Sequence, residues 1–199
     1  FGFYYQDDID AFNNLGVEVV YFDTMKDTKL PKVDGLFIGG GFPEMHLNGL
    51  SSNKSMLTDI RNKVNQGMPT YAECGGLMYL SNKITYKNNT YPMAGLVDAD
   101  TVISNRPVGR GYVKLESQAN HPWGNTSDCI YAHEFHYSKL ENISPSTSYA
   151  YKVLRGFGVD NSNDGIILHN LLASYSHLRN VNGNLWVNQF VNFIKSKKV

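Results

Sequence analysis

Two short apolar runs that end in glycine constrain the fold more than any other feature of the sequence. Residues 35–38 read Gly-Leu-Phe-Ile and lead into three glycines at 39–41, and residues 69–72 read Pro-Thr-Tyr-Ala and lead into Glu-Cys-Gly-Gly. Between them, residues 56–64 place their apolar side chains on one helical face. Short buried strands that alternate with helices are typical of a parallel sheet covered by helices. The sequence therefore predicts an α/β fold.

The other periodic segments extend this pattern along the chain. A β-branched run predicts a strand at residues 17–22, another buried strand is expected at 164–168, and helices are expected at 7–15 and 186–194. The middle of the chain differs, because short strand-like runs follow one another there with little helical pattern between them, at residues 97–102, 111–115, 130–137 and 148–153. We expect these runs to form an antiparallel or mixed insertion within one domain of 199 residues.

Composition excludes several classes of function. Lys and Arg together number 18, as do Asp and Glu, so the formal net charge is zero and no basic stripe indicates nucleic-acid binding. No apolar run approaches the roughly 20 residues that span a bilayer, so no membrane attachment is expected. Two cysteines make no disulfide framework, which indicates a reducing, cytoplasmic setting. Because the chain opens without Met on an aromatic cluster, we expect it to be a piece of a longer polypeptide.

Cys74 is the strongest candidate for chemistry. It follows an expected strand, precedes Gly75 and Gly76, and begins a helical run, as a nucleophile on a sharp strand-to-helix turn would. A helix N-terminus at this point favours the thiolate over the thiol. The alternative is a buried structural cysteine, which is the commoner fate of a free cysteine. Cys129 lies at the start of an expected strand and is expected to pack in the core.

A thiol nucleophile needs an imidazole that takes and returns its proton. His177 is the best candidate, because it follows the expected strand at 164–168 by one short connection. His133 and His136 are three residues apart on an expected strand, so their side chains would face opposite sides and would not share a metal ion. No metal site is expected, and structural roles are expected for the other three histidines, His46, His121 and His169.

The three glycines at 39–41 expose backbone N–H groups after a buried strand. Together with the N–H that follows Cys74 they could form an oxyanion hole, in which one donor is typically worth about 3 kcal/mol in the transition state. An ordinary turn is the alternative. A phosphate-binding loop is a weaker interpretation, because the run lacks the lysine and hydroxyl of that motif.

Four linked motifs resemble the C-terminal glutaminase domain of the cobyrinic acid a,c-diamide synthases. They are residues 34–44, 69–80, 133–138 and 173–177, and they occur in the family's order over nearly the whole chain. The members of this family are class I glutamine amidotransferases with a flavodoxin-like fold, which implies a mostly parallel sheet flanked by helices. The segments around residues 132–138 and 171–179 also resemble the branch that amidates sirohaem-type tetrapyrroles.

The resemblance implies a role for each site residue. Cys74 would attack the side-chain amide of L-glutamine, and His177 would activate Cys74 and protonate the leaving ammonia. The backbone around Gly40, Gly41 and Gly75 would hold the oxyanion. The ammonia would pass to a second active site, where an ATP-activated tetrapyrrole carboxylate becomes a carboxamide. That step implies ATP and Mg in a P-loop ATPase domain of the same polypeptide, and no cofactor in this chain.

Two departures from the family pattern matter. The usual triad has a glutamate two residues after the histidine, where this chain has Arg179, so Glu73 and Glu134 are the candidates for an orienting acid. Slow glutamine hydrolysis is then expected until the partner domain binds. The family's ATPase domain and first glutaminase strand would both precede Phe1, so residues 1–199 are interpreted as a glutaminase domain that lacks them.

Several alternatives are open. The acceptor could be a sirohaem or a nickel sirohydrochlorin instead of cobyrinic acid. A cysteine hydrolase acting on peptides or small amides would need no ATPase partner. A non-catalytic amidotransferase-like module would dock on an ATP-dependent ligase, although the joint presence of Cys74, His177 and the glycine loop argues against it. The oligomeric state is not indicated, and a homodimer is left open.

Overall fold

The apolar runs before the glycine loop and before Cys74 lie side by side in a sheet. In the computed structural model, which describes residues 1–124, 129–181 and 183–198, β1 (Leu36–Ile38) pairs in parallel with β2 (Thr70–Glu73). β2 in turn pairs in parallel with β11 (Leu171–Ser174). Every side chain of β2 and β11 is buried, as expected for parallel strands that are covered on both faces.

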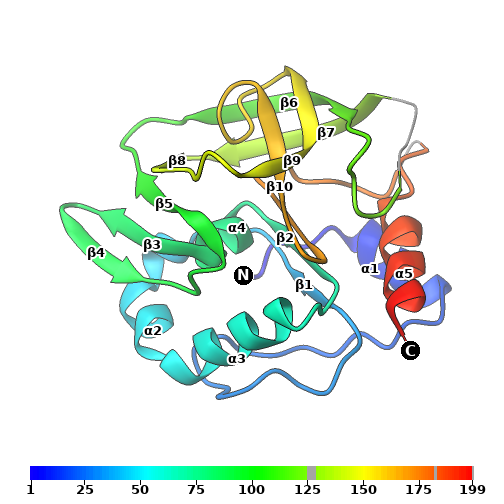
Figure 1. Cartoon of the computed structure of the whole chain (residues 1–199), viewed down its shortest axis with the longest axis horizontal. Coiled ribbons are helices and arrows are strands. Elements are labelled where there is room, and N and C mark those ends of the chain that lie inside the picture. Colours follow the sequence, from blue (N-terminus) through cyan, green and yellow to red (C-terminus); the bar gives the residue numbers. More distant parts are fainter. Residues whose placement is uncertain (125–128, 182, 199) are drawn as a thin grey trace.

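The remaining strands complete two mixed sheets (Figure 1). The larger sheet has seven strands in the order β1-β2-β11-β10-β9-β6-β7, and the smaller has four in the order β4-β3-β5-β8. The α/β class and the antiparallel insertion are therefore confirmed, with parallel pairing in the large sheet confined to β1, β2 and β11. The other strands are β3 (Ser81–Tyr86), β4 (Asn89–Pro92), β5 (Val97–Ile103), β6 (Gly109–Ser117), β7 (Cys129–His136), β8 (Ser138–Glu141), β9 (Ser148–Arg155) and β10 (Asn163–Leu168).

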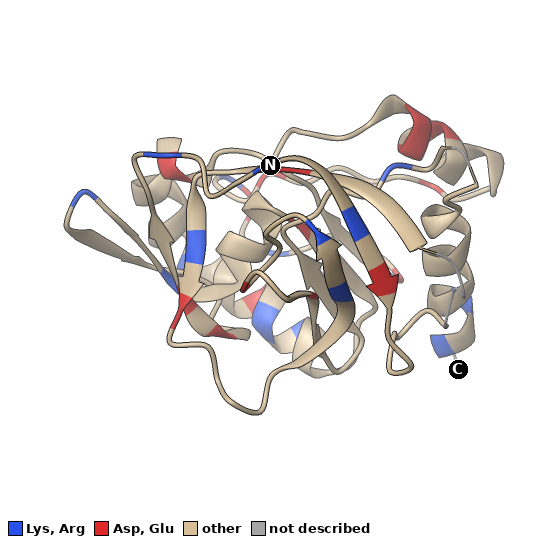
Figure 2. Cartoon of the chain, turned by 90° about the horizontal axis from the view of Figure 1, so that it is seen from above, with Lys and Arg blue, Asp and Glu red and all other residues tan. Residues whose placement is uncertain are grey.

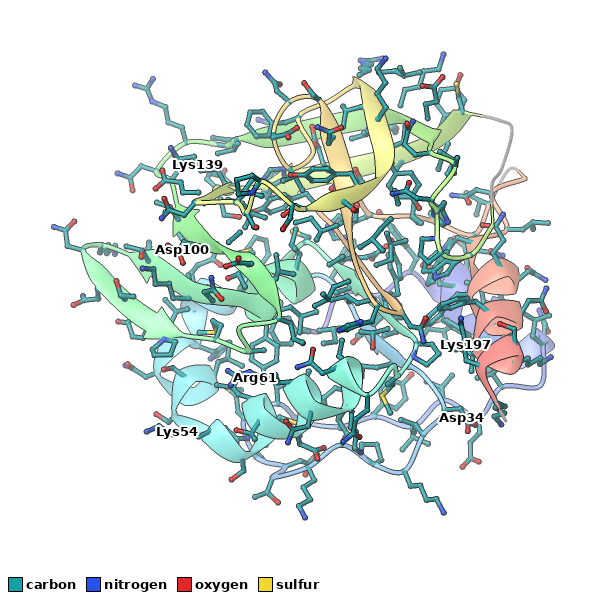
Figure 3. All side chains as sticks on the ribbon, viewed as in Figure 1. Asp34, Lys54, Arg61, Asp100, Lys139 and Lys197 are labelled. Carbon is teal, nitrogen blue, oxygen red and sulfur yellow. The ribbon has the colours of Figure 1, made fainter. Side chains whose placement is uncertain are left out.

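Alternate residues of the central strands face two separate cores. Ile38 and Ala72 pack in a core with α3, whereas Phe37 and Tyr71 pack in an aromatic core with Trp186 of α5. The helices thus cover both faces of the parallel strands, and Figure 3 shows the side chains that fill the space between the ribbons. The helices are α1 (Gln6–Asn14), α2 (Leu47–Ser52), α3 (Lys54–Asn65), α4 (Gly75–Leu80) and α5 (Trp186–Lys197).

The strand expected at residues 17–22 is wrong. These residues belong to no strand, and among the described strands β1 pairs only with β2. A cavity of about 690 Å³ lies between them, lined by the edge of β1 and by residues 15–25, with Phe1 and Tyr4 at its wall. Residues 17–22 and the edge of β1 thus face the same cavity and do not pair with each other. Cys74 and His177 do not line this cavity.

Cys129 corrects a second expectation. It is the first residue of β7, which is the last strand of the large sheet, and its side chain is exposed instead of packed in the core. The alternating run after it is buried only on every second residue, and Cys129 falls on the exposed side.

Charged residues of both signs are interspersed over the fold (Figure 2). Several form surface ion pairs, such as Lys83 with Asp100 at 3.2 Å and Lys198 with Asp34 at 2.7 Å. Within the described residues, no helix is both long enough and apolar enough to cross a membrane.

Candidate active site

Cys74 lies on a strained turn between β2 and α4. Its backbone φ is +47°, a value that is unusual for a residue other than glycine and is typical of a nucleophile elbow. Its N–H donates to the Ser174 carbonyl at 2.7 Å. This bond extends the β2–β11 pairing one residue beyond the end of β2. A Cβ on Gly76 would lie 2.3 Å from the Ile38 carbonyl oxygen, so only glycine lets α4 start this close to β1. The expected strand–turn–helix is confirmed.

His177 is held in place by backbone hydrogen bonds to β7. Its backbone exchanges hydrogen bonds with His133 of β7, at 2.7 Å for its N–H and 3.3 Å for its carbonyl. The residue is 4% exposed, and its imidazole meets the Phe3 ring edge-on with centroids 5.3 Å apart. Cys74 is among the neighbours that raise its pKa, and the Cys74 thiol itself donates to the Phe135 carbonyl at 3.7 Å. The structure therefore brings together the two residues that the sequence analysis selected as nucleophile and base.

The electrostatic setting of His177 favours its protonated form. Burial lowers the pKa of the imidazole, but its interactions with the neighbouring Cys74 and Glu73 side chains, which both favour the positive charge, outweigh that effect and raise the pKa to about 10. At neutral pH His177 is then an imidazolium, and a positive charge next to a cysteine favours the thiolate form of such a residue. Such a thiolate is the reactive form of cysteine.

The glycine loop approaches both residues closely. A Cβ on Gly40 would lie 2.4 Å from Cε1 of His177, and a Cβ on Gly75 would lie 2.6 Å from the Gly41 carbonyl oxygen. The backbone of the loop after β1 therefore lies against the turn after Cys74. This is the arrangement that an oxyanion hole built from the two segments requires.

Gly40→Ala tests this close approach. The added methyl group overlaps the His177 ring, which is buried and cannot move into solvent, so we expect the rate of glutamine hydrolysis to fall at least about tenfold. Gly2→Ala is the matched control, because its Cβ would meet nothing within 4 Å. Glutamate release is the measurement, with circular dichroism to verify the fold. Wild-type activity in Gly40→Ala would contradict the placement of the loop.

The two candidate acids occupy different surroundings. Oε2 of Glu73 lies 3.5 Å from Nδ1 of His177. Glu134 instead accepts N–H groups of Phe157 and Gly158 at 2.8 and 3.0 Å, and its second oxygen lies 3.6 Å from Nε2 of His136. The geometry thus places Glu73, and not Glu134, against the imidazole beside Cys74.

The other histidines separate as expected. The ring of His133 lies near His177, with centroids 5.4 Å apart, while the ring of His136 stacks on Tyr175 at 4.0 Å, so the two do not converge. His121 is buried against the Tyr151 hydroxyl at 2.9 Å, and its burial lowers its pKa to about 4. In the part of the chain that the structure describes, no group of three or more His, Cys, Asp or Glu residues is arranged to hold a metal ion.

Asp164 of β10 is a residue that the sequence analysis missed. Its carboxylate is completely buried and accepts hydrogen bonds from the N–H groups of Gly165, Tyr175 and Ser176 and from the hydroxyls of Ser174 and Ser176, at 2.6 to 3.0 Å. These contacts fix the three residues that precede His177. No local pattern marks Asp164, because its partners are about ten residues away and meet it only through the β10–β11 turn.

Comparisons with known proteins agree with this geometry. Residues 1–185 match the family model of the CobB/CobQ-like glutamine amidotransferase domain. The chain belongs to this amidotransferase family. A cobyrinate a,c-diamide synthase of Magnetococcus marinus is 43% identical over 178 residues, which cover 89% of this chain and 38% of that protein. The corresponding synthase of Methanosarcina barkeri is 41% identical over 195 residues, covering 91% of this chain and 39% of that protein.

Solved amidotransferase structures share the fold at low sequence identity. A glutamine amidotransferase crystal structure superposes with a TM-score of 0.66 at 16% identity, covering 96% of this chain and 93% of that chain. A structure of PurLQS from Thermotoga maritima gives a TM-score of 0.69 at 16% identity, covering 96% of this chain and 91% of that one. The class I amidotransferase fold expected from the motifs is confirmed. The chain spans about two fifths of the length of the curated relatives named above.

Proposed function

We propose that this amidotransferase chain hydrolyses glutamine and supplies ammonia for the ATP-dependent amidation of tetrapyrrole side-chain carboxylates. The observation that carries the proposal is the strained turn at Cys74 with the His177 imidazolium held against its thiol. The relatives' name, cobyrinate a,c-diamide synthase, supports a cobalamin precursor as the acceptor. The reaction needs a free thiol at Cys74, which a reducing cytoplasm would maintain.

The mechanism follows from the two side chains. The Cys74 thiolate attacks the side-chain amide carbon of glutamine, and its sulfur–carbon bond forms as the carbonyl electrons move to oxygen. His177 donates its proton to the amide nitrogen, which leaves as ammonia when the carbon–nitrogen bond breaks. Water, deprotonated by His177, then hydrolyses the thioester and releases glutamate. Burial of both residues strengthens their interaction with the charge that develops on oxygen.

The tetrahedral oxyanion is assigned to the backbone of Gly40, Gly41 and Gly75. Support comes from the contact between the loop after β1 and the turn after Cys74. ATP, Mg and a P-loop ATPase domain are proposed partners, since the chain covers only 38% and 39% of the two synthases to which it is similar. The tetrapyrrole would bind at that partner domain, where ammonia attacks the activated carboxylate.

A glutamine analogue that carries an electrophilic diazoketone in place of the amide tests the proposal. We expect it to add one covalent adduct at Cys74, detected by peptide mass spectrometry, and to abolish glutamate release. Excess glutamine should slow the labelling, whereas asparagine and small peptide amides should not. Labelling that these other amides block equally would indicate a general cysteine amide hydrolase. Absence of both labelling and glutamate release in the full-length protein would overturn the proposal.

A further inference from the structure

We propose that Glu73, the residue immediately before the nucleophile, is the positioning acid that orients and charges His177. This inference rests on the proposed glutaminase function and adds a residue to it. Arg179 stands two residues after His177, and residues 178–199 contain no Asp or Glu. The chain therefore needs another carboxylate if its imidazole is to be held by one.

The two carboxylate oxygens of Glu73 have different contacts. Oε1 accepts the Tyr71 hydroxyl at 2.6 Å and the Leu178 N–H at 2.8 Å. Oε2 is left to face Nδ1 of His177 at 3.5 Å, close enough for an ion pair and slightly too long for a well-formed hydrogen bond. Because the Leu178 N–H belongs to the residue after His177, the carboxylate is fixed to the backbone of the histidine that it faces.

Glu73 is buried, and among the described residues His177 is the charged side chain that pairs with its carboxylate. The side chain is 1% exposed, and among the described residues no lysine or arginine forms an ion pair with it. A buried carboxylate is strongly unfavourable unless a positive charge and hydrogen bonds compensate it. The His177 imidazolium provides that charge, while Tyr71 is itself buried and burial raises the pKa of its phenol, so it remains a neutral donor.

Arg179 is turned away from the site. Its guanidinium pairs with the Asp7 carboxylate, with Nε 2.6 Å from Oδ2, and lies 5.2 Å from the ring centre of Tyr5. The side chain at this position therefore points to the surface, and the position from which the usual acid would act serves to attach α1. The carboxylate that faces the imidazole is that of Glu73.

Three titratable side chains and one aromatic ring lie around His177. They are Cys74 at the start of α4, Glu73 at the end of β2 and His133 on β7, and Phe3 contributes an uncharged ring. Of these, only Cys74 and Glu73 can be negative. His133 opposes a positive charge on His177, since the charge of His177 helps lower the pKa of His133.

Glu73→Gln separates the charge of this residue from its hydrogen bonds. The amide oxygen can still accept from Tyr71 and Leu178, but no negative charge faces His177. We expect kcat for glutamine hydrolysis to fall about 100-fold or more, with KM changed by less than about threefold, because the carboxylate of a Ser-His-Asp triad is worth about 10⁴ in kcat. The His177 titration, followed by NMR of ¹⁵N-histidine, should move to lower pH, from about 10 in the wild type.

Asp8→Asn is the matched control. Asp8 is also a buried carboxylate that accepts one backbone N–H, from Asn180, and one side-chain donor, Nε1 of Trp186. It makes no ion pair with His177 among the described residues. Burial raises the pKa of Asp8 to about 7, so the fold disfavours its charge, and the asparagine amide oxygen can accept the same two hydrogen bonds. We therefore expect no loss of stability and no shift of the His177 titration in this variant. A shift as large as that of Glu73→Gln would indicate a general effect of altering a buried acid.

A measurement on Cys74→Ala decides the matter if Glu73→Gln does not fold. With the thiol removed, Glu73 is the remaining negative group beside His177. A His177 titration above the ordinary value of about 6.5 supports the proposal, and one at or below that value overturns it, because burial alone lowers the pKa. Wild-type kcat and an unshifted titration in Glu73→Gln would also overturn it. These outcomes would leave the glutaminase proposal standing, because that proposal fails only if the wild type releases no glutamate.

Discussion

Replacing Cys74 by serine is expected to lower glutamate release from glutamine by about 10⁴-fold or more, at unchanged fold. A serine hydroxyl is a much weaker nucleophile than a cysteine sulfur at neutral pH, so the reacting atom is lost, while Glu73 still faces His177. The substitution is nearly isosteric, and the buried site keeps a hydrogen-bonding group beside His177. The measurement is steady-state glutamate release by the full-length protein, with glutamine binding followed separately.

Cys129→Ser provides the internal comparison. Cys129 is the second cysteine of the chain and is exposed at the start of β7, so its replacement should leave glutamate release within about twofold of wild type. Glutamine should still bind to Cys74→Ser, since only the reacting atom has changed. If Cys74→Ser retained a substantial fraction of the wild-type rate, another residue would have to be the nucleophile.

Asp164→Ala is expected to have the largest effect on stability, lowering the free energy of unfolding by about 3–5 kcal/mol. The substitution removes a completely buried carboxylate that accepts hydrogen bonds from five donors, of which only the Ser176 N–H has a second acceptor, the Ser174 hydroxyl at 3.2 Å. Unsatisfied buried donors each cost on the order of 1–3 kcal/mol, and structural relaxation recovers part of that sum. The segment before His177 should also loosen, so activity should fall before the protein unfolds. Urea denaturation at neutral pH measures the first effect.

Asp160→Ala is the control for this variant. Asp160 also accepts several hydrogen bonds, from Ser162 and Asn163, but it is exposed on the turn between β9 and β10, where water can replace it. We expect a change below about 1 kcal/mol. Equal destabilisation by the two substitutions would show that the buried network around Asp164 contributes no more than a surface turn.

The parts of the site that were predictable from sequence depend on local signals. The turn at Cys74 follows from a short strand, a nucleophilic side chain and two glycines in consecutive positions. The Tyr71 hydroxyl is a local partner of Glu73, but its other contacts, with His177 and with the Leu178 N–H 105 residues away, form only in the folded chain. Asp164 is similar, because no local sequence pattern indicates that its carboxylate accepts hydrogen bonds from five donors. The catalytic roles of these residues stay predictions.

The incorrect strand at residues 17–22 has a related cause. Its β-branched residues have a genuine preference for extended structure, but a strand exists only if a neighbouring edge is within reach. The large sheet offers β1 as its edge, and the cavity separates the two segments. Propensity alone thus predicted a strand where the described residues form no pairing.

The same cavity means that backbone protection is distributed unevenly around His177. Amides of β2 and β11 are enclosed between two cores and should exchange with solvent only on global unfolding, whereas residues 17–22 should exchange through small local openings. Phe1, Gly2 and Tyr4 line the cavity, and the ring of Phe3, which lies between them in sequence, packs edge-on against His177. His177 therefore lies between the β7 backbone, to which it is hydrogen-bonded, and the ring of a residue next to the cavity.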